Sequence, residues 1–345
     1  MKTLKLTAIR TLELTNAPDP VIRHPKDVLL KIAAVGICGS DIHYYKQGRI
    51  GEQIIQFPFT LGHECTAIVE KIGKNVKTLS PGDHVAVDPQ VPCGTCSQCR
   101  AGRKHTCLNG KFLGCPGQLE GCLSDYIVMP EECCFKLDRN LDLISAVLIE
   151  PLSVAMHSYK LVTPEKNNRI GVFGVGPIGL SVTSILKTLG NNHVYGTDKL
   201  DYRLDIAAEL GADWRGNVET SDVVGEINAA EPDLLDAVYE CCGEQEALDQ
   251  AVELLRPGGT LYLVGIPEVN RISFDISKVR RKEICIQNVR RQNECMLDAI
   301  RFVEDNTRYR ELLITHVVSA DEAKKAFDLV GGYEDNVVKA VIRFN

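Results

Sequence analysis

A glycine-rich turn between an apolar strand and an apolar helix is the feature that most restricts how this 345-residue chain can fold. The turn reads Gly174-Val-Gly-Pro-Ile-Gly179 and follows residues 169–173, whose apolar side chains predict a buried strand. Residues 177–189 carry apolar side chains along one stripe and are followed by Gly190, which predicts a helix. A motif in this position is typical of dinucleotide binding, because the helix N-terminus can face a pyrophosphate.

An acidic residue follows the motif at the distance that nucleotide recognition requires. Asp198 comes directly after the predicted strand 194–197, and a carboxylate there would accept ribose hydroxyls of NAD and repel the 2′-phosphate of NADP. We expect NAD, with NADP as the alternative because of two nearby cations; the aspartate could also be only a cap. The expected cofactor contacts are Gly174, Gly176, Pro177, Ile178, Gly179, Asp198, Lys199, Arg203, Val264, Gly265 and Ile266.

The two halves of the chain differ in their pattern of elements. Beyond residue 169, strands (237–241, 260–264) alternate with helices (202–210, around 247–255), which predicts a doubly wound parallel sheet covered on both faces. The earlier half reads as short strands broken by Gly, Pro and Asp, which predicts a small barrel or sandwich with long loops. The expected class is α/β: a β-rich domain plus a Rossmann doubly wound domain. The early strands are expected at 28–35, 67–72 and 84–88.

Four cysteines fall within fifteen positions of the β-rich half. Thiolates at this spacing can converge on one ion, and Zn²⁺ favours a closed four-sulfur site. An iron–sulfur pattern that begins with the same spacing continues with a shorter gap and a proline, whereas Leu108 follows the last cysteine here. We expect a structural zinc, with an iron–sulfur cluster or free thiols as alternatives. The cysteines are Cys93, Cys96, Cys99 and Cys107.

Composition argues against several kinds of partner. The net charge of −7 disfavours nucleic acid and anionic membranes, because neither would be attracted electrostatically. No apolar run approaches the roughly 20 residues of a membrane span, and we expect no signal peptide. The remaining cysteines show no disulfide spacing, which favours a reducing, cytoplasmic location.

Four further side chains could serve a second metal ion. Cys38 follows the strand predicted at 28–35, His63 and Glu64 are adjacent, and Glu150 precedes a proline. Taken singly, each also suits an ordinary role as a small buried thiol, a surface pair or a helix-entry acid. Their interpretation therefore depends on the motifs around them.

Those motifs resemble the zinc-dependent medium-chain dehydrogenases over essentially the whole chain. Cys38-Gly-Ser-Asp41, Gly62-His-Glu64, the four-cysteine loop and the Rossmann glycines occur in that family's order. Residues 36–44, 48–51 and 150–153 are most similar to the sorbitol (polyol) dehydrogenase branch. The resemblance implies three parts. These are a GroES-like catalytic domain at 1–148, a Rossmann domain at 149–287 and a segment, 288–345, that returns to the catalytic domain.

The resemblance also implies a catalytic zinc held by Cys38, His63 and a carboxylate. Glu64 is the expected third ligand, with Glu150 beside the zinc-bound water or as the alternative ligand. An open zinc position polarises a substrate hydroxyl, and hydride then passes to NAD. Ser40 is expected to accept the alcohol proton and pass it toward solvent, through either the cofactor ribose or His43. Alternatively, Ser40 is a turn hydroxyl and His43 a surface residue.

The implied activity is oxidation of a secondary hydroxyl of a polyol or sugar acid to a ketone. Tyr44, Glu150 and Arg290 are expected to bind the substrate, although Arg290 could instead contact the cofactor or an acid. Arg291 stands where relatives often carry an aromatic residue, which could favour an acidic or phosphorylated sugar alcohol. Ala67 replaces a signature glycine, a change that we expect the turn to absorb.

Three alternatives to this activity remain at the level of sequence. A vicinal-diol dehydrogenase and an L-threonine-type dehydrogenase of the same family use similar motifs. A non-catalytic protein that binds zinc or NAD is the third. We also expect a homodimer or homotetramer, formed through the Rossmann domains.

Overall fold

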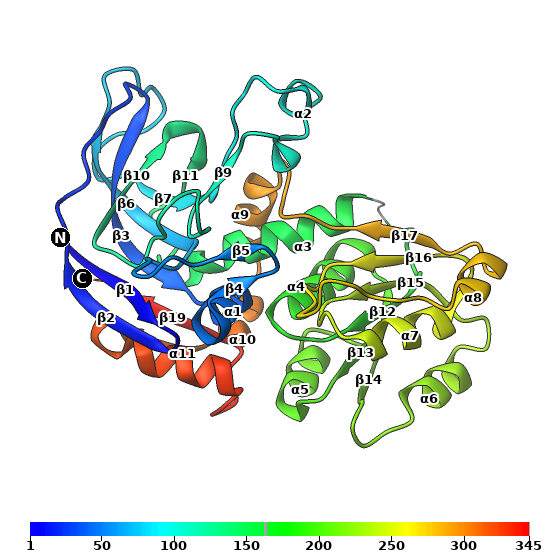
Figure 1. Ribbon diagram of the computed structural model, residues 1–345. Helices are drawn as coiled ribbons and strands as arrows, with labels where there is room; N and C mark the ends of the chain where they lie inside the picture. The colour runs from blue at the N-terminus through cyan, green and yellow to red at the C-terminus, as the bar shows by residue number, and fades with distance from the viewer. Residues whose placement is uncertain (162–163, 345) are drawn as a thin grey trace. The chain divides into compact units, whose positions relative to one another are not determined.

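The computed structural model describes residues 1–161 and 164–344, and the chain falls into two compact units. Unit 1 contains residues 1–150 together with the segment from Met296 onward, and unit 2 contains residues 151–295. The boundaries expected from the sequence lay at 148/149 and 287/288. In Figure 1 the blue N-terminal strands and the red C-terminal elements lie together in unit 1.

A seven-stranded sheet forms the frame of unit 1, in the order β11-β7-β6-β3-β19-β18, and β10 also pairs with β3. β3 (Asp27–Gly36) alternates between half-buried and buried residues, as expected for a strand with one face in a core. Its pairings are antiparallel, whereas β18 and β19 run parallel. The other strands of the sheet are β6 (Glu64–Ile72), β7 (His84–Val87), β10 (Tyr126–Pro130), β11 (Cys134–Lys136), β18 (Ile314–Ser319) and β19 (Lys339–Arg343).

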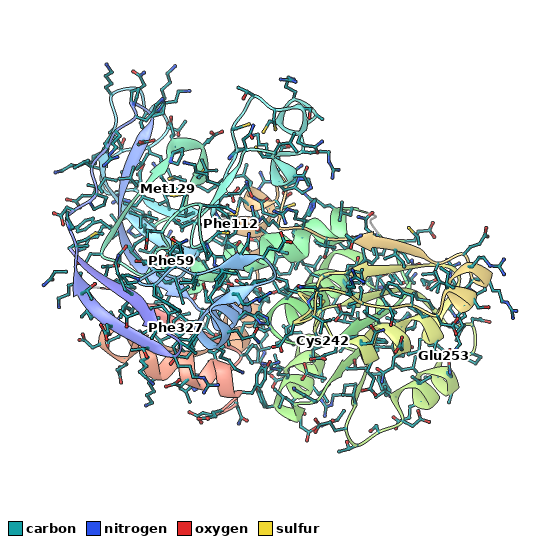
Figure 2. All side chains as sticks on the ribbon, in the orientation of Figure 1. Phe59, Phe112, Met129, Cys242, Glu253 and Phe327 are labelled. Carbon is teal, nitrogen blue, oxygen red and sulfur yellow. The ribbon has the colours of Figure 1, made fainter. Side chains whose placement is uncertain are left out.

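Short hairpins and helices surround this sheet. The core beneath it includes Phe59, Met129 and Phe327, all labelled in Figure 2. The two-stranded sheets are β1 (Lys2–Ala8) with β2 (Thr11–Asn16), β4 (Arg49–Ile50) with β5 (Gln53–Ile54), and β8 (Gln90–Val91) with β9 (Lys111–Phe112). The helices are α1 (Gly39–Gln47), α2 (Ser97–Arg100), α9 (Met296–Asp305), α10 (Thr307–Leu313) and α11 (Ala323–Gly332).

Unit 2 contains a six-stranded, wholly parallel sheet in the order β14-β13-β12-β15-β16-β17. The chain moves outward from β12 to β14, crosses back and continues outward from β15, which is the Rossmann order. Ligands of such sheets bind beyond the carboxyl ends of the strands where the direction reverses, here between β12 and β15. The strands are β12 (Arg169–Phe173), β13 (His193–Asp198), β14 (Trp214–Asn217), β15 (Leu235–Glu240), β16 (Leu255–Leu263) and β17 (Cys285–Asn288).

The three helices expected in this part of the chain are present and differ from expectation only at their ends, whereas its other helices were not predicted. The helix expected around residues 247–255 ends at Leu254, and Leu255 already has extended backbone. The helix expected at 177–189 is α-helical to Ile185 and closes with a π-helical turn, Leu186–Gly190. The helices are α3 (Ile149–Leu161), which begins in unit 1, α4 (Pro177–Ile185), α5 (Asp201–Glu209), α6 (Val223–Ala230), α7 (Gln245–Leu254) and α8 (Ile276–Arg281).

Among the residues that the structure describes, no helix has the length and apolar character needed to cross a membrane.

Candidate active site and cofactor site

Cys38, His63 and Glu64 come together although they are separated in the sequence. Each offers a ligand atom, and the three atoms lie within 4.8 Å of one another. The antiparallel pairing of β3 with β6 explains this, since Gly36 near the end of β3 lies opposite Glu64 at the start of β6. Cys38 is the N-cap of α1, and His63 immediately precedes β6. A thiolate, an imidazole and a carboxylate form a donor set that suits Zn²⁺.

Asp41, for which the sequence suggested no role, contacts the residues around this ligand group. Its carboxylate accepts hydrogen bonds from the backbone N–H of Cys38 (3.0 Å) and of Gly62 (3.2 Å). The same carboxylate lies 3.5 Å from Nδ1 of His63, so Nε2 is the ring nitrogen that can bind a cation. Burial lowers the pKa of His63, but the charges and hydrogen bonds of Asp41 and Cys38 together raise that pKa well above its ordinary value.

Lys339 binds Glu64 from the opposite side and was also missed. Its Nζ lies 2.9 Å and 2.7 Å from the two carboxylate oxygens and 3.1 Å from the carbonyl oxygen of Ile37. Both side chains are buried, at 2% and 1% exposure. Burial lowers the pKa of Lys339, yet Glu64, with Cys38 and Glu150, raises that pKa above its ordinary value. The signal was present in the sequence, because Lys339 is the one charge within the apolar run 337–342.

Gly36 leaves the space that this ion pair occupies. A Cβ at this position would lie 2.4 Å from Oε2 of Glu64 and 2.6 Å from the side chain of Val147. Any larger residue would therefore displace the Glu64 carboxylate or the helical turn that carries Val147. The glycine is required here for close approach, and its backbone conformation plays no part in the requirement.

Glu150 is buried in the first turn of α3. In the described part of the chain it lies outside the three-residue ligand group. Burial raises the pKa of Glu150 to about 7, with His63 lowering it and Glu64 raising it further. A carboxyl group with a pKa near neutrality can exchange protons efficiently at physiological pH.

Other predicted residues of unit 1 lie on α1. Ser40 and Tyr44 are four residues apart and therefore share one face of this helix. The Tyr44 hydroxyl donates to Oε1 of Gln53 at 2.9 Å, and His43 is half-buried on the same helix. Phe112, labelled in Figure 2, packs its ring against His63 with centroids 5.4 Å apart, a contact that the sequence analysis did not predict.

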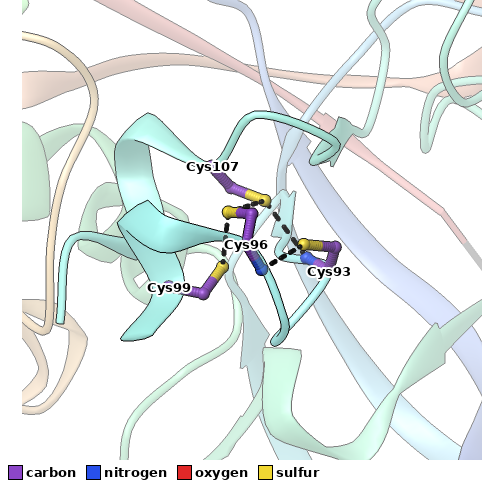
Figure 3. Close-up of side chains that lie close together, drawn as sticks. All are labelled: Cys93, Cys96, Cys99 and Cys107. Atoms are coloured by element: carbon purple, nitrogen blue, oxygen red, sulfur yellow. Dashed lines mark hydrogen bonds between the residues drawn. The ribbon is translucent and has the colours of Figure 1, made fainter. Parts of the chain in front are cut away.

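The four-cysteine loop forms a second, separate ligand group, shown in Figure 3. The Cys96 sulfur lies 3.6 Å from that of Cys99 and 3.7 Å from that of Cys107. Backbone N–H groups of the loop also point at sulfur, and those of Thr95 and Cys96 help lower the pKa of Cys93 to about 5. Four thiolates complete a tetrahedral shell, so an ion held there would have no open position.

The glycine turn of unit 2 has the close contacts that its motif predicts. Gly174 has a φ of +87°, and a Cβ there would lie 2.7 Å from Cβ of Cys242. A Cβ on Gly179 would lie 2.0 Å from the carbonyl oxygen of Gly174, so α4 can pack this closely only with glycine. Gly176 is the N-cap of α4, and Pro177 and Ile178 form its first turn. The exposed backbone N–H groups of this turn fit a pyrophosphate.

Asp198 is the last residue of β13, and its carboxylate is nearly buried. One oxygen accepts the N–H of Leu200 at 3.1 Å, and the other lies 3.8 Å from a guanidinium nitrogen of Arg203. A Cβ on Gly176 would be 3.4 Å from that same guanidinium, so Arg203 also approaches the glycine turn. Lys199 is exposed. The structure thus brings the predicted acid and one predicted cation together at the edge of the motif.

The remaining predicted cofactor residues follow β16. The N–H groups of Val264 and Gly265 both donate to the carbonyl oxygen of Glu240 at 2.9 Å. This holds residues 264–266 beside the carboxyl end of β15, where the sheet reverses direction. Arg290 is exposed and follows β17 in unit 2, whereas Tyr44 and Glu150 belong to unit 1.

Two known protein families match this chain, one in each half. Residues 24–139 match the alcohol dehydrogenase GroES-like domain, and residues 177–305 match the zinc-binding dehydrogenase family. Sorbitol dehydrogenase of Bacillus subtilis strain 168 is 32% identical over 343 residues, covering 99% of this chain and 97% of that protein. D-xylulose reductase A of Aspergillus oryzae is 34% identical over 330 residues, covering 93% of this chain and 91% of that protein.

A solved structure of an alcohol dehydrogenase from Escherichia coli CFT073, complexed with NADH, superposes with a TM-score of 0.91. It is 27% identical and covers 100% of this chain and 99% of that chain. Zinc and NAD are the cofactors of this group of enzymes. The profile matches and the full-length relatives lead to one conclusion: the chain belongs to the zinc-dependent medium-chain dehydrogenases, and it is most similar there to the sorbitol dehydrogenase branch.

Proposed function

We propose that this protein oxidises a secondary hydroxyl of a sugar alcohol to a ketone, with hydride transfer to NAD. The observation that carries the proposal is the convergence of Cys38, His63 and Glu64 in unit 1, where His63 and Glu64 also influence the pKa of the buried Glu150. A non-catalytic zinc protein would have no need for an incomplete ligand group of this kind beside the closed four-cysteine group.

In the proposed mechanism, Cys38, His63 and Glu64 hold the catalytic zinc, with Glu150 as the alternative ligand. When bound, zinc supplies a Lewis acid that lowers the pKa of a substrate hydroxyl. Asp41 fixes the His63 ring through Nδ1, and Lys339 holds the Glu64 carboxylate through both oxygens.

Proton transfer in this mechanism uses residues of α1 and the start of α3. Ser40 accepts the alcohol proton and passes it toward solvent through His43. Glu150, whose pKa lies at about 7, is suited to exchange a proton with water near the substrate.

NAD is the proposed acceptor because Asp198 places a nearly buried carboxylate beside the glycine turn. A 2′-phosphate would meet this carboxylate, and the cost of bringing two negative charges together favours NAD over NADP. Arg203 already pairs with Asp198, which leaves the local charge balanced without a phosphate.

Five- and six-carbon sugar alcohols are the proposed substrates, supported by the similarity to a sorbitol dehydrogenase and a D-xylulose reductase. The adjacent Arg290 and Arg291 make sugar acids and phosphorylated polyols the next substrates to test. A homodimer or homotetramer through the Rossmann unit remains part of the proposal.

The test is NADH formation by the zinc-loaded protein with four- to six-carbon polyols, their phosphates and aldonic acids. We expect turnover with at least one polyol, and loss of turnover in Cys38→Ser at unchanged far-UV circular dichroism. A zinc-replete preparation that reduces neither NAD nor NADP with any of these compounds would refute the proposal.

A further inference from the structure

Tyr44 and Gln53 form a hydrogen-bonded pair that the proposed mechanism leaves unused. We propose that Gln53 determines substrate specificity: together with Tyr44 it recognises hydroxyls of the polyol on carbons remote from the one that is oxidised. The inference rests on the proposed function for the class of substrate. It goes beyond that function because it assigns a role in substrate recognition to Gln53, a residue for which the sequence suggested none.

The short hairpin after α1 is built to bring Gln53 back to this helix. α1 ends at Gln47, and its C-cap Gly48 turns the chain with a left-handed backbone (φ 70°). β4 and β5 then pair, with Gln53 opposite Ile50, and the N–H of Ile55 donates to the Gly48 carbonyl at 2.8 Å. The hairpin is thereby closed at both ends, so the position of Gln53 beside Tyr44 is fixed by backbone pairing.

The pair presents complementary groups to a ligand. Tyr44 donates its only hydroxyl proton to Oε1 of Gln53, so toward a ligand the phenol oxygen can act only as an acceptor. The Gln53 amide has two N–H donors on Nε2, and within the described residues no hydrogen bond from Nε2 is formed. One hydroxyl of a vicinal diol could donate to Tyr44 while the neighbouring hydroxyl accepts from Gln53.

The next residue along the helix shows what a purely structural tyrosine looks like here. The Tyr45 hydroxyl lies 2.8 Å from Asp328 and 3.1 Å from the carbonyl oxygen of Arg10. Its ring packs on Phe327 with centroids 5.2 Å apart, and it is 1% exposed. Tyr44 is also buried, at 4% exposure, but its hydroxyl bonds the side chain of the half-buried Gln53.

The distance along α1 suits a substrate of several carbons. Cys38 precedes α1 as its N-cap, and Tyr44 lies six residues further on, about 9 Å along the axis. Helical side chains lean toward the N-terminus, which shortens the gap between the Tyr44 hydroxyl and the metal ligands. Ser40 lies between them on the same face. A short diol held at the metal would stop before the pair, whereas a pentitol would reach it.

The experiment compares Gln53→Leu with wild-type protein on xylitol and on butane-2,3-diol, both with NAD. Leucine has a similar size and lacks the donors. We expect KM for xylitol to rise about tenfold at nearly constant kcat, because remote binding contacts are lost. The parameters for butane-2,3-diol should be unchanged. Gln56→Leu, an exposed glutamine in the strand's continuation, is the matched control and should behave as wild type.

A second readout separates this inference from the proposed function. The shift in melting temperature on adding xylitol to zinc-loaded protein with NAD measures binding without turnover. A shift in the wild type that Gln53→Leu loses supports the subsite even if no ketone forms. Three results would overturn the inference: equal losses on both substrates, no loss on either, or equal xylitol-induced shifts in wild type and variant.

Discussion

Replacing Lys339 with methionine tests whether the metal group depends on the buried ion pair behind it. Lys339 contacts both oxygens of Glu64, and the two side chains are 2% and 1% exposed. Lys339→Met keeps much of the apolar stem and removes the charge, which leaves the Glu64 carboxylate buried without its cation. Breaking a buried pair from one side costs about 3–5 kcal/mol, most of it the desolvation of the remaining charge.

The assay is urea unfolding of the metal-free protein, followed by far-UV circular dichroism. Lys324→Met is the control, because Lys324 and Asp328 form an exposed pair of similar length, 2.6 Å, at 56% and 43% exposure. That variant should lose less than about 1 kcal/mol. The double variant Lys339→Met/Glu64→Gln should lose less stability than Lys339→Met alone, since it no longer has an unpaired buried carboxylate.

Zinc provides the second arm of this test. A cation next to Glu64 would offset the negative charge that Lys339→Met leaves unpaired. The loss of stability should therefore be smaller when the variant is loaded with zinc. The reasoning fails if Lys339→Met loses no more stability than Lys324→Met. It also fails if neutralising Glu64 makes the deficit larger.

Three further predictions concern the two ligand groups. Asp41→Asn should weaken zinc binding at one of the two sites by about 10- to 100-fold in chelator competition, because His63 loses the carboxylate that orients it; unchanged affinity at both sites would contradict this. Cys96→Ala should lose one zinc per chain and stability before it loses the chemical step, so a stable variant lacking only turnover would speak against a structural role. In the metal-free protein, burial raises the folded pKa of Glu150 from 4.5 to about 7, so stability should fall as pH rises through that interval, by up to about 3 kcal/mol; Glu150→Gln should flatten this dependence in urea unfolding.

Local sequence patterns were sufficient to predict the Rossmann unit. The glycine turn requires close backbone approaches that only glycine allows, and Asp198 follows at the end of the next strand, as observed. Both cysteine-containing ligand groups were also predicted, the four-cysteine loop because all its ligands come from one short segment. The three-residue group depended on resemblance, because β3–β6 pairing cannot be read from spacing alone.

The partners of the metal ligands were harder to predict. Lys339 lies 275 residues from Glu64 in the sequence, and only the insertion of β19 beside β3 brings them together. Asp41 had no predicted role, and two of its three interactions form only because Gly62 and His63 lie next to the start of α1. Phe112 approaches His63 through β9, a two-residue strand that no hydrophobic pattern identifies.

The position of β19 in the unit 1 sheet has a consequence for biosynthesis. Residues 341–343 pair with β3, yet the ribosome makes them after all of unit 2. Unit 2 can therefore fold as a continuous segment during translation, while residues 34–36 of β3 in unit 1 still lack their β19 partner. Zinc cannot bind beside the completed Glu64–Lys339 pair until translation has passed residue 339. Nascent chains stalled before β19 should consequently be more prone to aggregate and to need chaperones than chains released after it.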